Sequence, residues 1–192
     1  MGNNYVAVLL LSALLIIYVL YCNSKINFIS NIDDLYTYVA HYTPLTDRKA
    51  FMIKQLNKNK LKYEFMTDYD RENLTKNDLS TFTKDVILTE VSVFLKHINI
   101  LYKILYNPYQ YNLVLEDDVV LAKDFNVKLR KVLQKLPDDY DIMCIGNCDN
   151  MPIPKEEIIR ADRTRCCDSM LISKNGAYKI INNFTNTKKL IS

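Results

Sequence analysis

The sequence is poor in glycine and histidine and has no tryptophan. Its three glycines, Gly2, Gly146 and Gly176, are too scattered to form a Walker A loop or a Gly-x-Gly-x-x-Gly dinucleotide turn. The two histidines, His41 and His97, cannot supply a three-histidine zinc site, and no Gly-x-Ser-x-Gly elbow is present. These absences exclude P-loop and Rossmann-type nucleotide binding, zincin chemistry and the α/β-hydrolase mechanism.

The chain also lacks an excess of charge of either sign. It has 25 Lys and Arg residues against 22 Asp and Glu residues, a formal net charge of +3 over 192 residues. A nucleic-acid partner is therefore not expected. The hydrophobic fraction of 49% is that of a globular protein, and the length suits one folded domain.

One long stretch, 5–22, contains no charged residue. As a helix it would be about 27 Å long, near the thickness of a bilayer core, and it has neither the basic leader nor the cleavage site of a signal peptide. We therefore predict an uncleaved transmembrane signal-anchor over 5–22 after a short leader, 1–4. A polar stem, 23–34, would join it to a folded domain over 35–192.

Strand-like and helix-like segments alternate along this domain, which predicts an α/β sandwich with a mostly parallel sheet. Thr46 or Asp47 is positioned to cap the first helix. The predicted strands cover 35–42, 63–67, 111–115, 142–145 and 170–173, and the predicted helices cover 48–59, 89–105, 125–136 and 176–184.

Three consecutive carboxylates, Glu116, Asp117 and Asp118, directly follow an apolar strand. Ligands of open α/β sheets bind beyond the carboxyl ends of the strands, so this position predicts a site. Glu116 and Asp118 can point the same way and share one divalent cation while Asp117 points elsewhere. An acidic turn without a ligand is the alternative. A cation would relieve the repulsion among the carboxylates and would suit diphosphate chemistry.

Five blocks of the sequence form a recognisable series. The most specific is Leu-Val-Leu-Glu-Asp-Asp-Val at 113–119, and the other four lie at 45–48, 88–97, 140–146 and 169–177. These blocks, in this order, resemble those of glycosyltransferase family 25, which includes bacterial lipooligosaccharide and collagen hydroxylysine galactosyltransferases. Two features depart from the family pattern: Lys96 stands where a serine usually precedes the histidine, and the sequence ends at Ser192, earlier than family members do.

The resemblance implies a GT-A-like nucleotide-sugar-binding fold that uses a UDP-sugar donor. It implies Mn²⁺ or another divalent cation at Glu116 and Asp118, with donor contacts from Arg48, His97 and Asp117. The guanidinium of Arg48 matches phosphate geometry, and the His97 imidazole can donate to phosphate or sugar oxygens. A surface salt bridge for Arg48 and a purely structural role for His97 are the alternatives.

Family members invert the anomeric carbon, so the resemblance also implies a base that deprotonates the acceptor hydroxyl. Asp168, which precedes the strand of the last block, is our first candidate for this base, and Asp141 is the second.

The sequence thus predicts a membrane-anchored, metal-assisted hexosyltransferase that moves galactose or glucose to a hydroxyl group of a glycan or a protein. Family analogy places its domain in the lumen of the secretory pathway, where Asn73 and Asn183 would be glycosylation acceptors. Lys25 alone favours the opposite orientation. A catalytically inactive glycosyltransferase-fold protein that acts as a binding or scaffolding module at the membrane is the alternative.

Overall fold

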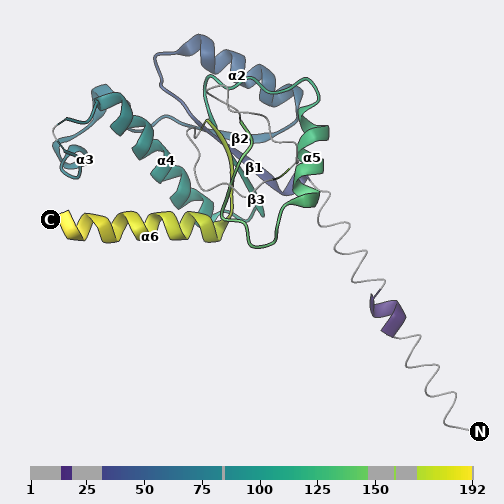
Figure 1. The fold of residues 1–192 in the computed structure, drawn as a ribbon. Helices are drawn as coiled ribbons and strands as arrows, with labels where there is room; N and C mark the ends of the chain where they lie inside the picture. The colour runs from purple at the N-terminus through teal and green to yellow at the C-terminus, as the bar shows by residue number, and fades with distance from the viewer. Residues whose placement is uncertain (1–13, 19–31, 84, 147–157, 159–167, 192) are drawn as a thin grey trace, which may run out of the picture.

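The computed structural model describes residues 14–18, 32–83, 85–146, 158 and 168–191. Figure 1 shows a central sheet with helices packed around it, so the predicted α/β class is confirmed. The strands are β1 (Leu35–Ala40), β2 (Lys62–Met66), β3 (Tyr111–Glu116), β4 (Ile142–Cys144) and β5 (Ser169–Ile172). The helices are α2 (Thr46–Lys58), α3 (Lys76–Leu79), α4 (Leu88–Tyr106), α5 (Phe125–Lys135) and α6 (Lys174–Ile191), with 3-10 turns η1 (Ile32–Asp34) and η2 (Arg71–Asn73).

The five strands lie in the order β2-β1-β3-β5-β4. Strands β1, β2 and β3 pair in parallel, whereas β5 pairs antiparallel with both β3 and β4. The sheet is therefore mixed: four strands point one way and β5 runs the other way, so the predicted mostly parallel sheet contains one reversed strand.

Each face of the sheet is covered by two helices, because side chains of successive strand residues point to opposite faces. Leu35 and Val39 of β1 belong to a core cluster completed by residues of α2 and α5. Tyr38 and Ala40 point the other way, into a cluster completed by α4 and α6. The result is a three-layer arrangement in which the sheet lies between the two helix pairs.

Strand β1 ends two residues before the predicted limit, at Ala40, while α6 extends well past the predicted end. The predicted side-chain caps of α2 are wrong. Thr46 and Asp47 are already helical, Leu45 occupies the N-cap position, and no side chain caps the helix. Helix α3, which the sequence did not predict, has a complete capping box formed by Thr75 and Asp78.

Only residues 14–18 of the predicted anchor are described, and they are helical. Within the described residues, no helix is both long enough and apolar enough to cross a membrane. The rest of 5–22 lies outside the described residues. The last part of the predicted stem belongs to the fold, because η1 contributes Ile32 to the core cluster on the side of α2 and α5.

Candidate active site

The carboxyl ends of β1 and β3 meet at one edge of the sheet, since the two strands are parallel neighbours with Ala40 beside Glu116. His41 follows β1 directly and the acidic triplet follows β3. Strand β5 runs the other way, so its beginning lies at this edge, where the Glu116 amide donates to the Asp168 carbonyl oxygen at 2.8 Å. We call this edge, with His41, the triplet and Asp168, the carboxylate edge.

Asp117 points into the protein and is almost fully buried. Its Oδ2 lies 2.7 Å from His41 Nδ1 and accepts a hydrogen bond from the Tyr42 amide at 3.2 Å. Its Oδ1 accepts from Arg48 at 3.1 Å. Asp117 therefore ties the end of β1 and the start of α2 to the end of β3. The contacts group Asp117 with Asp118, which share Arg48, and place Glu116 beside His97, whereas the sequence predicts that Asp117 points away from the other two carboxylates.

Arg48 bridges two members of the triplet. The same guanidinium nitrogen that contacts Asp117 also donates to Asp118 Oδ2 at 3.2 Å. The hydrogen bond to Asp117 is the main cause that raises the pKa of Arg48, with Asp118 contributing further. Both Arg48 and Asp118 remain about half exposed, so both can reach a ligand outside the protein.

Glu116 lies beside His97 of α4. The Glu116 Oε1 and His97 Nε2 atoms are 3.5 Å apart, within ion-pair range if the imidazole is protonated. No hydrogen bond to a described residue satisfies the buried Nε2 atom. Glu116 is one third exposed, so its carboxylate stands between this imidazole and solvent.

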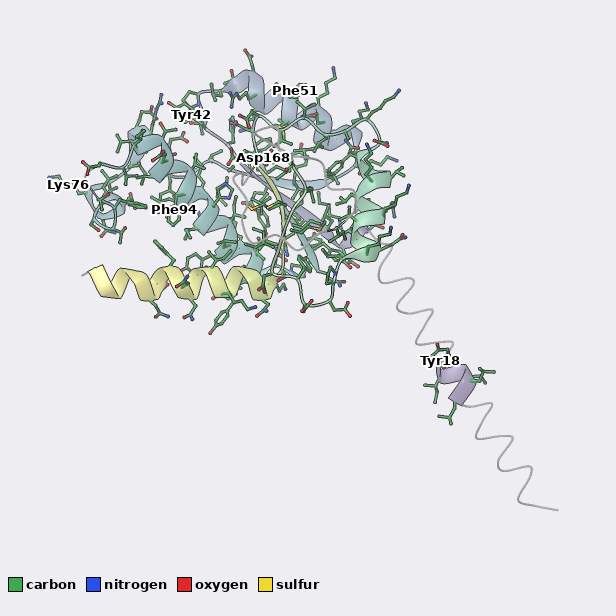
Figure 2. The ribbon with its side chains drawn as sticks, viewed as in Figure 1. Tyr18, Tyr42, Phe51, Lys76, Phe94 and Asp168 are labelled. Carbon is green, nitrogen blue, oxygen red and sulfur yellow. The ribbon has the colours of Figure 1, made fainter. Side chains whose placement is uncertain are left out.

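Asp118 and Asp168 line the same cavity, of about 510 Å³, between the turn after β3, helix α5 and the ends of β4 and β5. Figure 2 shows the side chains around Asp168. Gly146 also lines the cavity, and a Cβ atom there would lie 2.6 Å from Asp168 Oδ1 and 2.2 Å from Ser169 Oγ. The glycine is therefore what leaves room for the Asp168 carboxylate.

The structure does not bring Asp141, the second candidate base, to the carboxylate edge. Asp141 precedes β4, and β4 points the same way as β3, so Asp141 lies at the opposite edge. Lys179 donates to both of its carboxylate oxygens, at 2.7 and 2.9 Å, and Asn175 donates at 3.1 Å. These contacts attach the start of β4 to α6 and give Asp141 a structural role.

Lys96, which departs from the family pattern, forms a buried ion pair with Asp70. The Lys96 ammonium donates to Asp70 Oδ1 at 2.7 Å and to the Asp68 carbonyl oxygen at 2.6 Å, and both paired side chains are under 5% exposed. The other Asp70 oxygen accepts from the Thr43 amide and hydroxyl. Burial alone would raise the pKa of Asp70, but the hydrogen bonds from Lys96 and Thr43 outweigh it and hold the pKa below its usual value.

The sequence alone predicts no role for His41 or Asp70. Both follow strands whose carboxyl ends lie at this edge, since His41 comes directly after β1 and Asp70 comes four residues after β2. The rule that singled out the triplet therefore applied to these residues as well.

The predicted need for a cation to relieve repulsion in the triplet is met in part by the protein itself. Asp117 and Asp118 contact Arg48, Asp117 also contacts His41, and Glu116 faces His97. No group of three or more His, Cys, Asp or Glu side chains suited to a metal occurs among the residues described. Within the triplet, Glu116 and Asp118 are the two carboxylates that face solvent.

Comparison with curated proteins finds no match. The chain does match a family model, described as Glycosyltransferase family 25 (LPS biosynthesis protein), over residues 36–189. The match includes every strand of the sheet except the first residue of β1, and it includes the triplet, Arg48, His97 and Asp168. It covers far more than half of the chain, and we conclude that the protein belongs to glycosyltransferase family 25.

Proposed function

We propose that this glycosyltransferase moves a hexose, galactose or glucose, from a UDP-sugar to a hydroxyl group of a glycan or a protein, with metal assistance and inversion at the anomeric carbon. Family membership supports the transferase activity and the binding of a sugar donor and acceptor. The observation that carries the finer proposal is the cavity lined by both Asp118 and Asp168 at the carboxylate edge. In this one cavity, Asp118 is available to the sugar donor and Asp168 is available as a base for the acceptor.

The residues present fit a metal that is completed by its substrate. Mg²⁺-like ions in such sites are held by one or two carboxylates, and the phosphates of the substrate supply further oxygen ligands. Glu116 and Asp118 provide two solvent-facing carboxylates for such a site. Bound there, Mn²⁺ would neutralise charge on the diphosphate leaving group.

Arg48 and His97 are the donor-side contacts in this proposal. Arg48 keeps an exposed guanidinium beside Asp118, where it can contact diphosphate oxygens with the geometry that phosphate favours. His97 has a buried nitrogen without a hydrogen bond to a described residue, beside Glu116. Asp117 was predicted to bind the donor directly, but its burial suits a positioning role that orients Arg48 and His41.

Asp168 is the proposed base. Asp168 lines the same cavity as Asp118, and Gly146 leaves the space that the Asp168 carboxylate occupies. An acceptor hydroxyl placed in the cavity would transfer its proton to Asp168 as its oxygen attacks the anomeric carbon, while the bond to the nucleotide breaks. Asp168→Asn keeps the size of the side chain and removes its basicity, so it should abolish transfer while UDP still binds.

Anchoring by 5–22 in a membrane of the secretory pathway, with the domain in the lumen, is part of the same proposal. It is supported by the uncharged run in the sequence and by the position of the folded domain after it.

Calorimetric titration with UDP and UDP-sugars, with and without Mn²⁺, tests the donor site. The full chain in detergent should bind UDP in a metal-dependent manner, and Asp118→Ala should lose this binding. Asp139→Ala is the matched control, because Asp139 is an exposed aspartate in the turn before β4, at the opposite edge of the sheet. A folded wild-type protein that binds neither UDP nor a UDP-sugar would overturn the proposal and favour an inactive scaffolding protein.

A further inference from the structure

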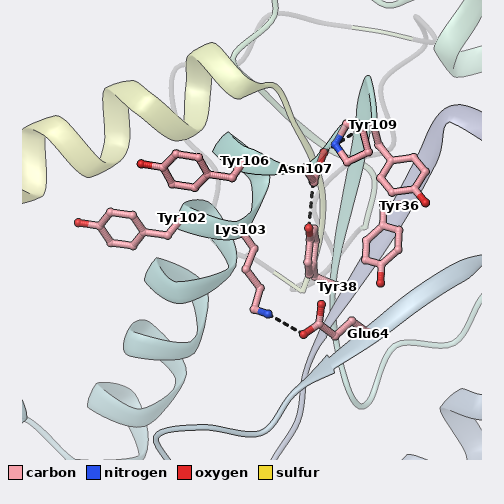
Figure 3. Close-up of a pocket in the computed structure, with 9 residues that line it drawn as sticks. Tyr36, Tyr38, Glu64, Tyr102, Lys103, Tyr106, Asn107 and Tyr109 are labelled. Atoms are coloured by element: carbon pink, nitrogen blue, oxygen red, sulfur yellow. Dashed lines mark hydrogen bonds and ion pairs between the residues drawn. The ribbon is translucent and has the colours of Figure 1, made fainter.

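A second cavity, of about 580 Å³, opens on the α4 face of the sheet, near the beginnings of the strands. We call it the tyrosine groove, because five of the nine residues that line it are tyrosines. Figure 3 shows the tyrosines of β1 and of the turn before β3 on one side of Lys103, and Tyr102 and Tyr106 on the other side, with their rings directed away from the strand tyrosines. The proposed donor chemistry makes no use of this space.

On the strand side of the groove, ring contacts and hydrogen bonds hold the tyrosines in fixed positions. The rings of Tyr36 and Tyr109 stack with centroids 4.8 Å apart, and Tyr36 also contacts Tyr38, at 5.1 Å. Asn107 fixes this arrangement, since its amide nitrogen donates to the Tyr38 hydroxyl at 2.9 Å and its oxygen accepts from the Tyr109 amide at 2.9 Å. The aromatic faces are therefore held in place before any ligand arrives.

The helix side supplies exposed rings and a charge pair. Tyr106 is 85% exposed and Tyr102 is 43% exposed, which is unusual for large side chains that line a cavity. Their hydroxyl groups make no hydrogen bond to any residue that the structure describes. Between the two sides, the Lys103 ammonium donates to Glu64 Oε1 at 2.7 Å, and both side chains are more than one third exposed.

From this arrangement we infer that the tyrosine groove binds a neutral saccharide chain, the part of a glycan acceptor that does not react. The C–H faces of a sugar ring carry small positive charges that match the negative face of an aromatic ring. Each sugar hydroxyl both donates and accepts, so it can bind an exposed carboxylate and an exposed ammonium at once. Glu64 and Lys103 neutralise each other, so the groove carries no net charge from this pair that would favour an ionic ligand.

Helix α4 runs from the groove to the carboxylate edge. Lys103 pairs with Glu64 at the groove, Asn99 one turn earlier contacts Asp68 at 3.4 Å, and His97, on another side of the helix, lies beside Glu116. From Tyr106 to His97 is nine residues of helix, or about 14 Å. A saccharide chain bound in the groove can therefore extend toward the proposed transfer site. That the bound saccharide is the acceptor rests on the proposed function.

An aromatic groove also suits a proline-rich peptide, which docks through ring contacts with its extended helix. The exposed charge pair favours the saccharide, because proline side chains offer nothing that bonds to a carboxylate or an ammonium.

Screening the full chain on an array of neutral oligosaccharides, followed by calorimetry with the best one, tests the inference. The detergent must carry no sugar headgroup. We expect binding without UDP or metal, and a loss of about tenfold in affinity for the double variant Tyr102→Ala/Tyr106→Ala. Tyr178→Ala is the matched control, since Tyr178 is equally an exposed tyrosine on a helix but lies outside the groove. Tyr102→Phe/Tyr106→Phe keeps both rings and should retain most of the affinity.

Each other result would overturn the inference: no oligosaccharide binds, binding is the same in the double alanine variant, or decaproline binds the groove in place of a sugar. Far-UV circular dichroism verifies that the variants are folded. Failure here is distinct from failure of the donor proposal, because glycan binding is measured without nucleotide and UDP binding is measured without glycan.

Discussion

Replacing Lys96 by methionine removes the cation of a buried ion pair and leaves Asp70 with a buried charge. Removing one partner of such a pair typically costs about 3 to 5 kcal/mol of folding free energy. Asp70 would still accept hydrogen bonds from Thr43, which partly compensate its charge. We therefore expect Lys96→Met to lower the free energy of unfolding by about 3 kcal/mol, a large share of the 5 to 15 kcal/mol that is typical of a domain.

The same helix provides a matched control. Lys103 forms an ion pair of the same length, 2.7 Å, but that pair is more than one third exposed, and exposed pairs contribute about 0 to 1 kcal/mol. Urea unfolding of the full chain, followed by circular dichroism, should thus show a much larger loss for Lys96→Met than for Lys103→Met. Equal losses, or a loss below 1 kcal/mol for Lys96→Met, would refute the assignment of Lys96 to a stabilising buried pair.

Three further predictions concern acid stability, the cavity and orientation in the membrane. The pKa of Asp70 is lowered in the folded state. Its contribution to stability is therefore complete above the unfolded pKa of about 3.9 and is lost as the pH falls through the folded pKa. In urea titrations, Asp70→Asn should lose less stability between neutral and acid pH than the wild type does. Gly146→Ala should displace the Asp168 carboxylate and reduce the rate of sugar transfer more than the affinity for UDP, both measured on the same preparation. If the domain is lumenal, expression in a secretory cell should add a glycan at Asn73, the exposed last residue of η2, before it adds one at Asn183 within α6, and a gel-mobility shift lost in Asn73→Gln would show it.

The periodicity of the sequence predicts the strands and the long helices of the domain well, because apolar spacing reports directly which side of an element is buried. The helix ends were harder to predict. Helix α2 begins at Thr46 without a side-chain cap, so the polar residues there gave a misleading signal, whereas the capping box of α3 encloses a helix too short to show a period. Local propensity thus identified the elements but did not settle their boundaries.

Strand direction depends on tertiary pairing, which the sequence does not report locally. An all-parallel sheet would place Asp168, which precedes β5, at the edge opposite the triplet. The reversal of β5 brings Asp168 beside Glu116, while Asp141 stays at the far edge because β4 keeps the common direction. The two candidate bases occupy equivalent places in the sequence, directly before a strand, and only the direction of that strand separates them.

What compensates the charge of the triplet also depends on tertiary contacts that the local sequence does not report. From the sequence, three adjacent carboxylates indicated that a cation or a hydrogen-bond donor must compensate them. In the structure, the compensation of Asp117 comes from His41 and Arg48, which lie 76 and 69 residues away in the chain. The repulsion among the carboxylates is therefore no longer an argument for a metal by itself. The argument now rests on exposure: Asp117 is buried among its donors, whereas Glu116 and Asp118 still face solvent, where a cation and a diphosphate can reach them.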